Sequence, residues 1–258
     1  MTYACKGCRN LCARVDPPWL ACKPHRLCQQ VDRSLIELLA TISGKPVHLD
    51  IVRRIDAQVG RNFVTATRVA ESLRFPRGPE QFREWLVSTH RALFADTGLS
   101  FAGRFRTSGE PAFFGGEGKH GRAGSVADKI AGEINQLGAT MFGGAPHGID
   151  NLDAIRFRGC AAVFLERFFR THPFVDGNGR IARLLLRVAA AETGRVAFDL
   201  LLRQNAKARR RYVSALQLAH KFPEASGAYA PLEAWITSHL STLPDSSSLI
   251  EAEPPEYR

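Results

Sequence analysis

The sequence predicts an all-α fold with one β-hairpin, because four stretches have helical apolar spacing and one glycine-rich stretch does not. The helical stretches cover residues 81–94, 126–137, 152–169 and 180–194. Residues 100–124 lose this period and contain seven glycines, so we expect a β-hairpin or flap there. The breaker Phe75-Pro76-Arg77-Gly78-Pro79 separates this core from helical patterns before it.

Two of these stretches show which face should be buried. In residues 81–94 the expected core face is Phe82, Trp85, Leu86, Leu93 and Phe94. In residues 152–169 the expected stripe is Leu152, Ile155, Val163, Phe164 and Phe168. The chain then divides into a cysteine-rich segment (1–33), a helical extension (34–79), a core (80–243) and a tail (244–258).

Composition limits the size and the partners of the protein. The chain has 258 residues, 45% hydrophobic and 23% charged, which fits one medium domain with a small appendage. Lysine and arginine total 35 against 25 acidic residues, and the net charge of +10 favours anionic partners such as nucleotides, nucleic acid or acidic proteins. Because the start has no apolar signal region and no stretch approaches about 20 apolar residues, we expect a soluble, cytoplasmic protein.

Five of the six cysteines lie in the first 28 residues, at positions 5, 8, 12, 22 and 28. Cys5-x2-Cys8 and Cys22-x2-His25 have the spacing of a tetrahedral zinc site, which would stabilise a segment too short to bury its own core. Either Cys12 or Cys28 could replace His25 as the fourth ligand. The alternative is a tail that carries cysteines and holds no metal.

The most informative segment is Thr171-His172-Pro173-Phe174-Val175-Asp176-Gly177-Asn178-Gly179-Arg180-Ile181-Ala182-Arg183, which lies between two predicted helices. A polar, glycine-rich loop before a helix presents backbone N–H groups and the positive end of the helix dipole to an anion. Gly177 and Gly179 would let a phosphate approach the backbone, and Arg180 and Arg183 lie on one side of the first turns.

Two side chains of this loop have the chemistry that a bound nucleotide needs. Asp176 supplies a carboxylate for Mg²⁺, which also binds phosphate oxygens and water. His172 is close enough in sequence to serve as a base in the same pocket. Gly177 to Ala182 also fits G-x-G-x-x-A, but a dinucleotide-binding loop requires a strand before it. The segment therefore predicts a site for an Mg-nucleotide and a proton acceptor.

Residues His172 to Arg183 match every fixed position of H-x-F-x-[D/E]-G-N-G-R-x-x-R, and the chain therefore resembles the Fic family over about residues 80–240. The resemblance also rests on His90-Arg91-Ala92-Leu93-Phe94 and Phe101-Ala102-Gly103-Arg104. It implies a Fic-type helical bundle with a β-hairpin flap. The activity that it implies is transfer of AMP from ATP to a hydroxyl side chain of a target protein.

The resemblance also implies roles for single residues. His172 becomes the base that deprotonates a Ser, Thr or Tyr hydroxyl, and Asp176 holds Mg²⁺ against the α- and β-phosphates. Arg180 and Arg183 bind the outer phosphates, while Phe174 is a structural plug.

Three further roles follow from the same resemblance. Asn178 and the N–H groups from Gly177 to Arg180 form an anion hole. In related Doc-type kinases lysine stands at the position of Gly179, so this glycine argues against phosphorylation. Asn205 or Tyr212 borders the adenine pocket.

Two glutamates are candidates for self-inhibition, which many Fic proteins achieve with [S/T]-x-x-x-E-[G/N]. Ser247 to Ala252 contains Glu251, and Thr67 to Ser72 contains Glu71, but neither has glycine or asparagine at the last position. Glu251 is the slightly favoured candidate, and either glutamate would pair with the second arginine of the motif. An antitoxin partner is the alternative source of control, and the sequence leaves open whether the protein is a toxin, an effector or a regulator.

The basic run from Arg203 to Arg211 gives a rival interpretation. As a helix it would place Leu202, Tyr212, Leu216 and Ala219 on an apolar face and the arginines in solvent. Together with the zinc-like segment it could instead belong to a nucleic-acid-binding protein with a vestigial Fic site. A further alternative is a Fic enzyme that transfers UMP.

Overall fold

The computed structural model describes residues 47–110, 127–140, 153–193, 196–198, 206–223 and 227–242, together with residues 39, 44 and 225. Its helices are α2 (Leu49–Ser72), α3 (Pro79–Leu93), α4 (Ala127–Thr140), α5 (Ala154–Thr171), α6 (Asn178–Thr193), α7 (Ala206–Lys221) and α8 (Ala230–Thr237). The expected helical fold is confirmed. Among the described residues, no helix is long and apolar enough to cross a membrane.

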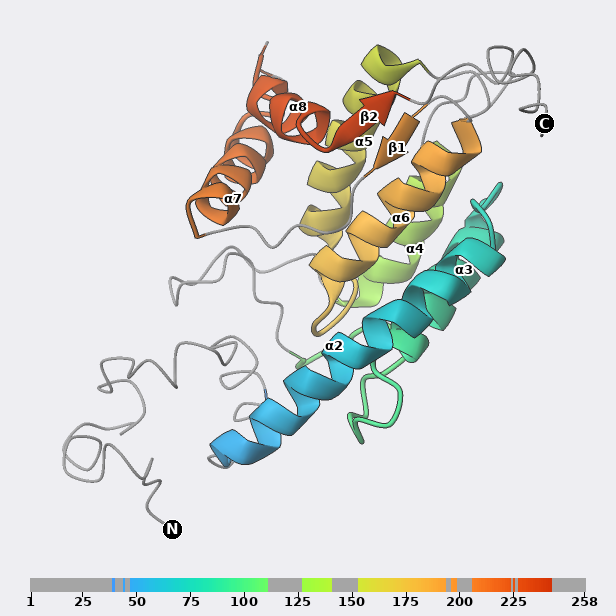
Figure 1. Ribbon diagram of the computed structural model, residues 1–258, viewed down its shortest axis with the longest axis vertical. Helices are drawn as coiled ribbons and strands as arrows, with labels where there is room; N and C mark the ends of the chain where they lie inside the picture. Colours follow the sequence, from blue (N-terminus) through green and yellow to red (C-terminus); the bar gives the residue numbers. More distant parts are fainter. Residues whose placement is uncertain are drawn as a thin grey trace, which may run out of the picture.

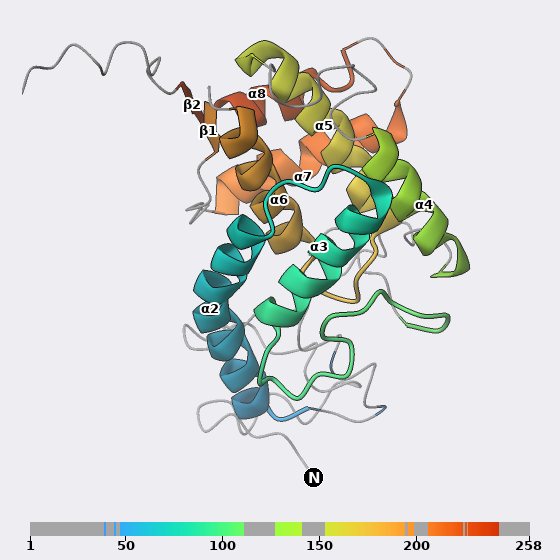
Figure 2. The same ribbon diagram turned by 90° about the vertical axis from the view of Figure 1, so that its right-hand side faces the viewer.

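Helix α6 lies at the centre of the bundle and packs against α2, α3 and α5 (Figure 1). Its buried side chains recur on several faces, as expected for a helix surrounded by others, and include Ile181, Leu184, Leu185, Leu186 and Val188. The helices α7 and α8 pack against α5, and α2 and α3 lie side by side (Figures 1 and 2). The start of α6 is therefore held in place from several directions.

Helix α2 is tied to α3 by buried polar contacts as well as by apolar packing. The Asn62 amide donates to the carbonyl oxygens of Leu93 (3.2 Å) and Ala95 (2.6 Å) at the end of α3. The Trp85 indole donates to the Ala70 carbonyl oxygen at 3.1 Å. Because end carbonyls of a helix have no partner within the helix, Asn62 satisfies groups that would otherwise be buried unpaired.

The predicted stripe of residues 152–169 is half right. Phe164 and Phe168 are buried, but Ile155 is 66% exposed and Val163 is 36% exposed. The buried face of α5 is instead centred on residues at helical spacing, namely Phe157, Ala161, Phe164, Leu165 and Phe168. For α3 and α7 the predicted faces are confirmed, since the predicted residues that the structure describes are buried.

The strands that the structure describes do not lie where the hairpin was expected. β1 (Val196–Phe198) pairs antiparallel with β2 (Leu240–Thr242), with Ala197 opposite Ser241. Residues 100–110 contain turns and no strand, and residues 111–124 of the expected hairpin lie outside the described residues. Gly103 and Gly109 have positive φ in this part, which favours turns over an extended strand.

Candidate active site

The predicted site is the short loop between α5 and α6, and hydrogen bonds within the loop hold its two ends together. Helix α5 ends at Thr171, and His172 adopts a left-handed backbone conformation with φ 46° and ψ 63°. Asn178, the first residue of α6, accepts from the Phe174 N–H at 3.0 Å and donates to the Phe174 carbonyl at 2.8 Å. The buried Asn178 side chain therefore ties the start of α6 to the backbone of Phe174. Its predicted role in an anion hole stays a prediction.

Gly177 and Gly179, which were assigned one role, have different reasons to be glycine. Gly177 has φ 84°, and a Cβ there would lie 2.8 Å from Phe94 Cε2. This glycine is required by the backbone and by packing against α3. At Gly179 a Cβ would find only ordinary contacts, at 3.5 Å from Arg183 Nη1 and 3.9 Å from Phe169. Packing alone therefore accounts for glycine at position 177 but not at position 179, and the role of both glycines in phosphate approach stays a prediction.

The start of α6 offers donors to an anion. The backbone N–H groups of Asn178 and Gly179 have no hydrogen-bond partner among the described residues, as expected for the first residues of a helix. Arg180 adds a guanidinium whose Nη1 is buried without a hydrogen bond in the same described part, 4.0 Å from Asp176 Oδ2. A buried donor without an acceptor indicates a site that an oxyanion would complete.

Asp176 fits a role in Mg²⁺ binding. One carboxylate oxygen accepts from the Gly177 N–H at 2.6 Å, and the side chain is 30% exposed at the mouth of the loop. Within the described ranges, no group of three or more histidine, cysteine or acidic side chains is placed to hold a metal ion. Mg²⁺ is usually held by one or two carboxylates together with phosphate oxygens and water, so the single Asp176 carboxylate at the mouth of the loop is a suitable ligand for it.

The charge of Arg183 on α6 acts on Tyr212 of α7. Tyr212 is buried, with its ring 4.2 Å from the Trp235 ring centre and 6.3 Å from that of Phe169. Its hydroxyl has no hydrogen-bond partner among the described residues. Burial raises the pKa of this phenol, and the nearby positive charge of Arg183 opposes the rise. Tyr212 is thus a buried, neutral phenol within the electrostatic reach of the second arginine of the motif.

His172 is buried and neutral at physiological pH. Burial and, to a smaller extent, the positive charge of Arg106 lower the pKa of its imidazole to about 4, while a hydrogen bond with the Phe169 backbone acts in the opposite direction. A neutral imidazole can accept a proton, and 6% of the residue remains exposed. The protonation state therefore agrees with the predicted role as a base.

Sequence analysis missed His90 as a support of this loop. Its Nδ1 accepts from the Gly103 N–H at 2.9 Å, so Nε2 carries the proton and donates to the Asp176 carbonyl oxygen at 3.0 Å. The imidazole also stacks on the Phe174 ring, with 4.0 Å between ring centres. Phe174 is fully buried, in agreement with its expected role as a plug. The sequence did contain a signal for His90: it lies one turn after Leu86, which places it on the buried face of α3.

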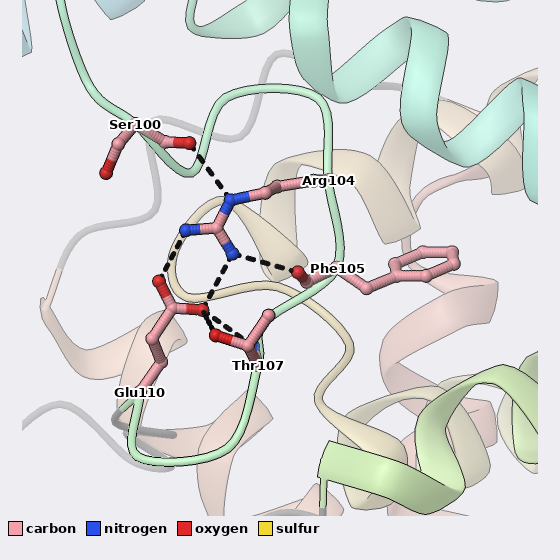
Figure 3. Close-up of polar contacts among 5 residues, drawn as sticks. All are labelled: Ser100, Arg104, Phe105, Thr107 and Glu110. Carbon is pink, nitrogen blue, oxygen red and sulfur yellow. Dashed lines mark hydrogen bonds and ion pairs between the residues drawn. The ribbon is translucent and has the colours of Figure 1, made fainter.

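Residues 99–110, which we call the bracing segment, lie beside the loop and are closed by an ion pair. Figure 3 shows the Arg104 guanidinium held by both carboxylate oxygens of Glu110, at 2.6 and 2.8 Å. Glu110 also accepts from the Thr107 N–H at 2.6 Å. The hydrogen bond from Arg104 is the main reason that the pKa of Glu110 falls to about 2. Phe105 points away from this cluster (Figure 3), and its ring lies 5.3 Å from that of Phe174.

Several predicted residues are not brought to this site. Glu71 pairs with Arg187 at 2.8 Å, one turn beyond Arg183, so the expected pairing with the second motif arginine is wrong for Glu71. The predicted zinc ligands (Cys5, Cys8, Cys22, His25 and Cys28), Asn205 and Glu251 lie outside the described residues. A cavity of about 400 Å³ lined by Phe75, Arg77 and Glu192 lies at the far end of α6 and does not include the loop.

Comparison with known proteins agrees with the motif. Residues 82–190 match the family described as Fic/DOC. The BepC effector of Bartonella tribocorum, solved with bound AMPPNP, is 18% identical with a TM-score of 0.58, over 78% of this chain and 91% of that one. The N-terminal Fic domain of a putative cell filamentation protein from Bartonella quintana, solved with bound ADP, is 19% identical with a TM-score of 0.56, over 81% and 92%.

A third solved structure lies outside this group of effectors. The Fic domain containing signaling protein of Bacteroides thetaiotaomicron is 16% identical with a TM-score of 0.56, over 79% of this chain and 75% of that one. None of the curated proteins matches the chain. Residues 82–190 are therefore similar to the Fic/DOC family, within a chain that has the fold of Fic proteins.

Proposed function

We propose that the protein is a nucleotidyltransferase that moves AMP from ATP to a hydroxyl side chain of a target protein. The observation that carries the proposal is that one loop combines a neutral, buried imidazole with an unsatisfied helix start. His172 accepts a proton, while the N–H groups of Asn178 and Gly179 and the Arg180 guanidinium are donors for phosphate oxygens. The Fic structures with bound AMPPNP and ADP support nucleotide binding by this fold.

The chemistry requires little more than positioning, charge stabilisation and one base. The target oxygen forms a bond to the α-phosphorus, the bond between that phosphorus and the bridging oxygen breaks, and pyrophosphate leaves. The hydroxyl proton passes to the His172 ring. Arg180 and Arg183 hold the departing phosphates, and the start of α6 stabilises the charge on the α-phosphate.

The remaining groups orient the nucleotide. Asp176 would hold Mg²⁺, which supplies charge neutralisation to the phosphates when bound. Tyr212, whose ring packs on Trp235 and lies within the electrostatic reach of Arg183, would form part of the wall of the adenine pocket. Gly179 lets the α-phosphate approach the backbone, and a lysine there would crowd that approach.

The test is to incubate the full chain, alone and with candidate lysate, with ATP labelled at either the α- or the γ-phosphate. We expect covalent label from the α-phosphate only, and no label with His172→Ala. His48→Ala is the matched control, because His48 lies at the start of α2, outside the loop, and should still transfer label. Label from the γ-phosphate only would mean kinase activity, and label from α-labelled UTP in place of ATP would mean UMP transfer.

A further inference from the structure

The end of α5, where the proposed base lies, is bound by one side chain from the bracing segment. The Arg106 Nε donates to the His172 carbonyl oxygen at 2.7 Å, and its Nη2 donates to the Thr171 carbonyl oxygen at 3.3 Å. The Arg106 backbone N–H donates to the Pro173 carbonyl oxygen at 2.9 Å. Three consecutive carbonyl groups, from Thr171 to Pro173, are thus held by one residue.

This point of the chain needs such support for two reasons. The last carbonyl groups of a helix have no partner within the helix, and buried carbonyls without partners are destabilising. His172 in addition has φ 46°, a left-handed conformation that is unfavourable for a residue with a Cβ. A cation that binds these carbonyls satisfies them and is favoured by the negative end of the α5 dipole.

Arg106 is also suited to this place by its own environment. It is buried, with 7% of its surface exposed, and burial lowers its pKa. The negative charges of Glu133 on α4 and Glu110 in the bracing segment act in the opposite direction and favour the charged guanidinium. The positive charge of Arg106 lowers the pKa of the His172 imidazole, and the negative charges of the two glutamates raise the pKa of Arg106.

We infer that Arg106 is a positioning residue for His172: its hydrogen bonds to three consecutive carbonyl groups hold the backbone of the proposed base in its left-handed conformation. Its positive charge adds to the larger effect of burial in disfavouring the protonated imidazole. The inference rests on the proposed role of His172 as the base. It assigns to Arg106 an effect on the rate of transfer and on the titration of His172, with no contact to the nucleotide.

The experiment separates the geometry from the charge with two substitutions in the full chain. Arg106→Lys keeps the charge and loses the forked guanidinium, whereas Arg106→Gln loses both. The matched control is Arg167→Gln, which removes a positive charge from the exposed side of α5, the helix that directly precedes His172. The measurements are the rate of AMP auto-modification, the KM for ATP, and the pH titration of the His172 imidazole by NMR, assigned with His172→Ala.

We expect kcat to fall by about 10²-fold in both Arg106 variants, because a small misplacement of a reacting group has an effect of that order. The KM for ATP should stay the same. The pKa of His172 should rise in Arg106→Gln, remain low in Arg106→Lys, and be unchanged in Arg167→Gln. This pattern would support the inference.

Other results would overturn it. A kcat like that of the wild type in both folded Arg106 variants would exclude positioning, and an unchanged His172 titration in Arg106→Gln would exclude the effect of charge. Failure of both variants to fold, with Arg167→Gln folded, would show that Arg106 supports the whole bundle rather than His172. The titration needs neither a target protein nor turnover, so it distinguishes a failure of this inference from a failure of the proposed activity.

Discussion

The motif segment (172–183) and the bracing segment (99–110) lie against each other, but their polar groups are used differently. In the motif segment the Arg180 Nη1 and the first N–H groups of α6 have no hydrogen-bond partner among the described residues. In the bracing segment Arg104 and Arg106 are bound to a carboxylate and to backbone carbonyls. The donors left for chemistry thus lie in the motif segment, whereas the arginines of the bracing segment are used to hold the backbone in place.

The largest effect is expected at Arg180, on the motif side of this comparison. Arg180→Ala should lower kcat/KM by about 10²–10³-fold, because it removes a donor proposed to stabilise phosphate charge. The free energy of unfolding should change by less than about 0.5 kcal/mol, since the lost guanidinium makes no hydrogen bond with the described residues through Nη1. The label assay and urea unfolding check both expectations.

The control for this substitution is Arg187→Ala, two turns later on the same helix. Arg187 pairs with Glu71 on the exposed surface and should affect neither transfer nor stability by much. Equal loss of transfer in the two variants would contradict the assignment of phosphate binding to Arg180.

A second prediction concerns Gly177, which lies in the motif and packs closely against the buried Phe94 side chain. Gly177→Ala should lower the free energy of unfolding by about 2–4 kcal/mol, because it combines a strained φ with overpacking against Phe94. Gly179→Ala is the matched control and should leave stability unchanged while slowing transfer. Similar stability losses in both variants would mean that the contacts at Gly179 are tighter than the structure gives.

The third prediction tests the support that α3 gives to the loop. His90→Phe keeps an aromatic ring on Phe174 but leaves the Gly103 N–H and the Asp176 carbonyl without their partner. The free energy of unfolding should fall by about 1–3 kcal/mol, and binding of Mg-ATP should weaken because the Asp176 backbone is released. Calorimetric Kd values for ATP with Mg²⁺ measure this. Unchanged affinity would show that the stack alone positions Asp176.

Sequence patterns predicted the motif segment because its functions depend on local order. Helical spacing places α5 and α6 on both sides of the loop, and the spacing of Asp176, Arg180 and Arg183 puts them at one helix start. The resemblance added the roles of these residues. These predictions depend only on residues that are neighbours in the sequence, which a pattern can reveal.

The contacts of the bracing segment could not be predicted from the sequence because they are long-range. Arg106 reaches carbonyls 65 and 66 positions away, and His90 reaches a carbonyl 86 positions away. Backbone carbonyls have no residue identity, so nothing in the sequence marks them as the partners of an arginine. Glycines and aromatic residues around positions 100–114 instead suggested a hairpin, although Gly103 forms a turn against Arg91.

A smaller effect is expected for the ion pair that closes the bracing segment. Glu110→Gln should lower the free energy of unfolding by about 1 kcal/mol or less, because the Arg104 side chain is 37% exposed and solvent screens the pair. The pKa of Glu110 is lowered in the folded state, to about 2. The carboxylate of Glu110 therefore stabilises the folded state fully above its unfolded-state pKa of 4.5, and this stabilisation is lost as the pH falls toward 2.

Urea unfolding of the wild type and of Glu110→Gln at pH 7 and pH 3 measures this contribution. We expect the stability difference between the two proteins to be smaller at pH 3 than at pH 7. A difference that does not depend on pH would show that the Thr107 contacts, and not the carboxylate charge, hold the segment.

The smallest effect is expected at Glu71, which lies on α2 and belongs to neither the motif segment nor the bracing segment. Glu71 and Arg187 are 46% and 44% exposed, so Glu71→Gly should change the free energy of unfolding by little more than the effect of glycine near a helix end. Because Glu71 binds Arg187 and not Arg183, AMP auto-modification should stay at the wild-type rate.

The same substitution at Glu251 makes the contrast that decides self-inhibition. If Glu251 supplies the inhibitory carboxylate, Glu251→Gly raises auto-modification while Glu71→Gly does not, since only the former would release Arg183 for the phosphates. A rise with Glu71→Gly would mean that α2 moves by a turn along α6 in solution, so that Glu71 leaves Arg187 and pairs with Arg183 in the inhibited state.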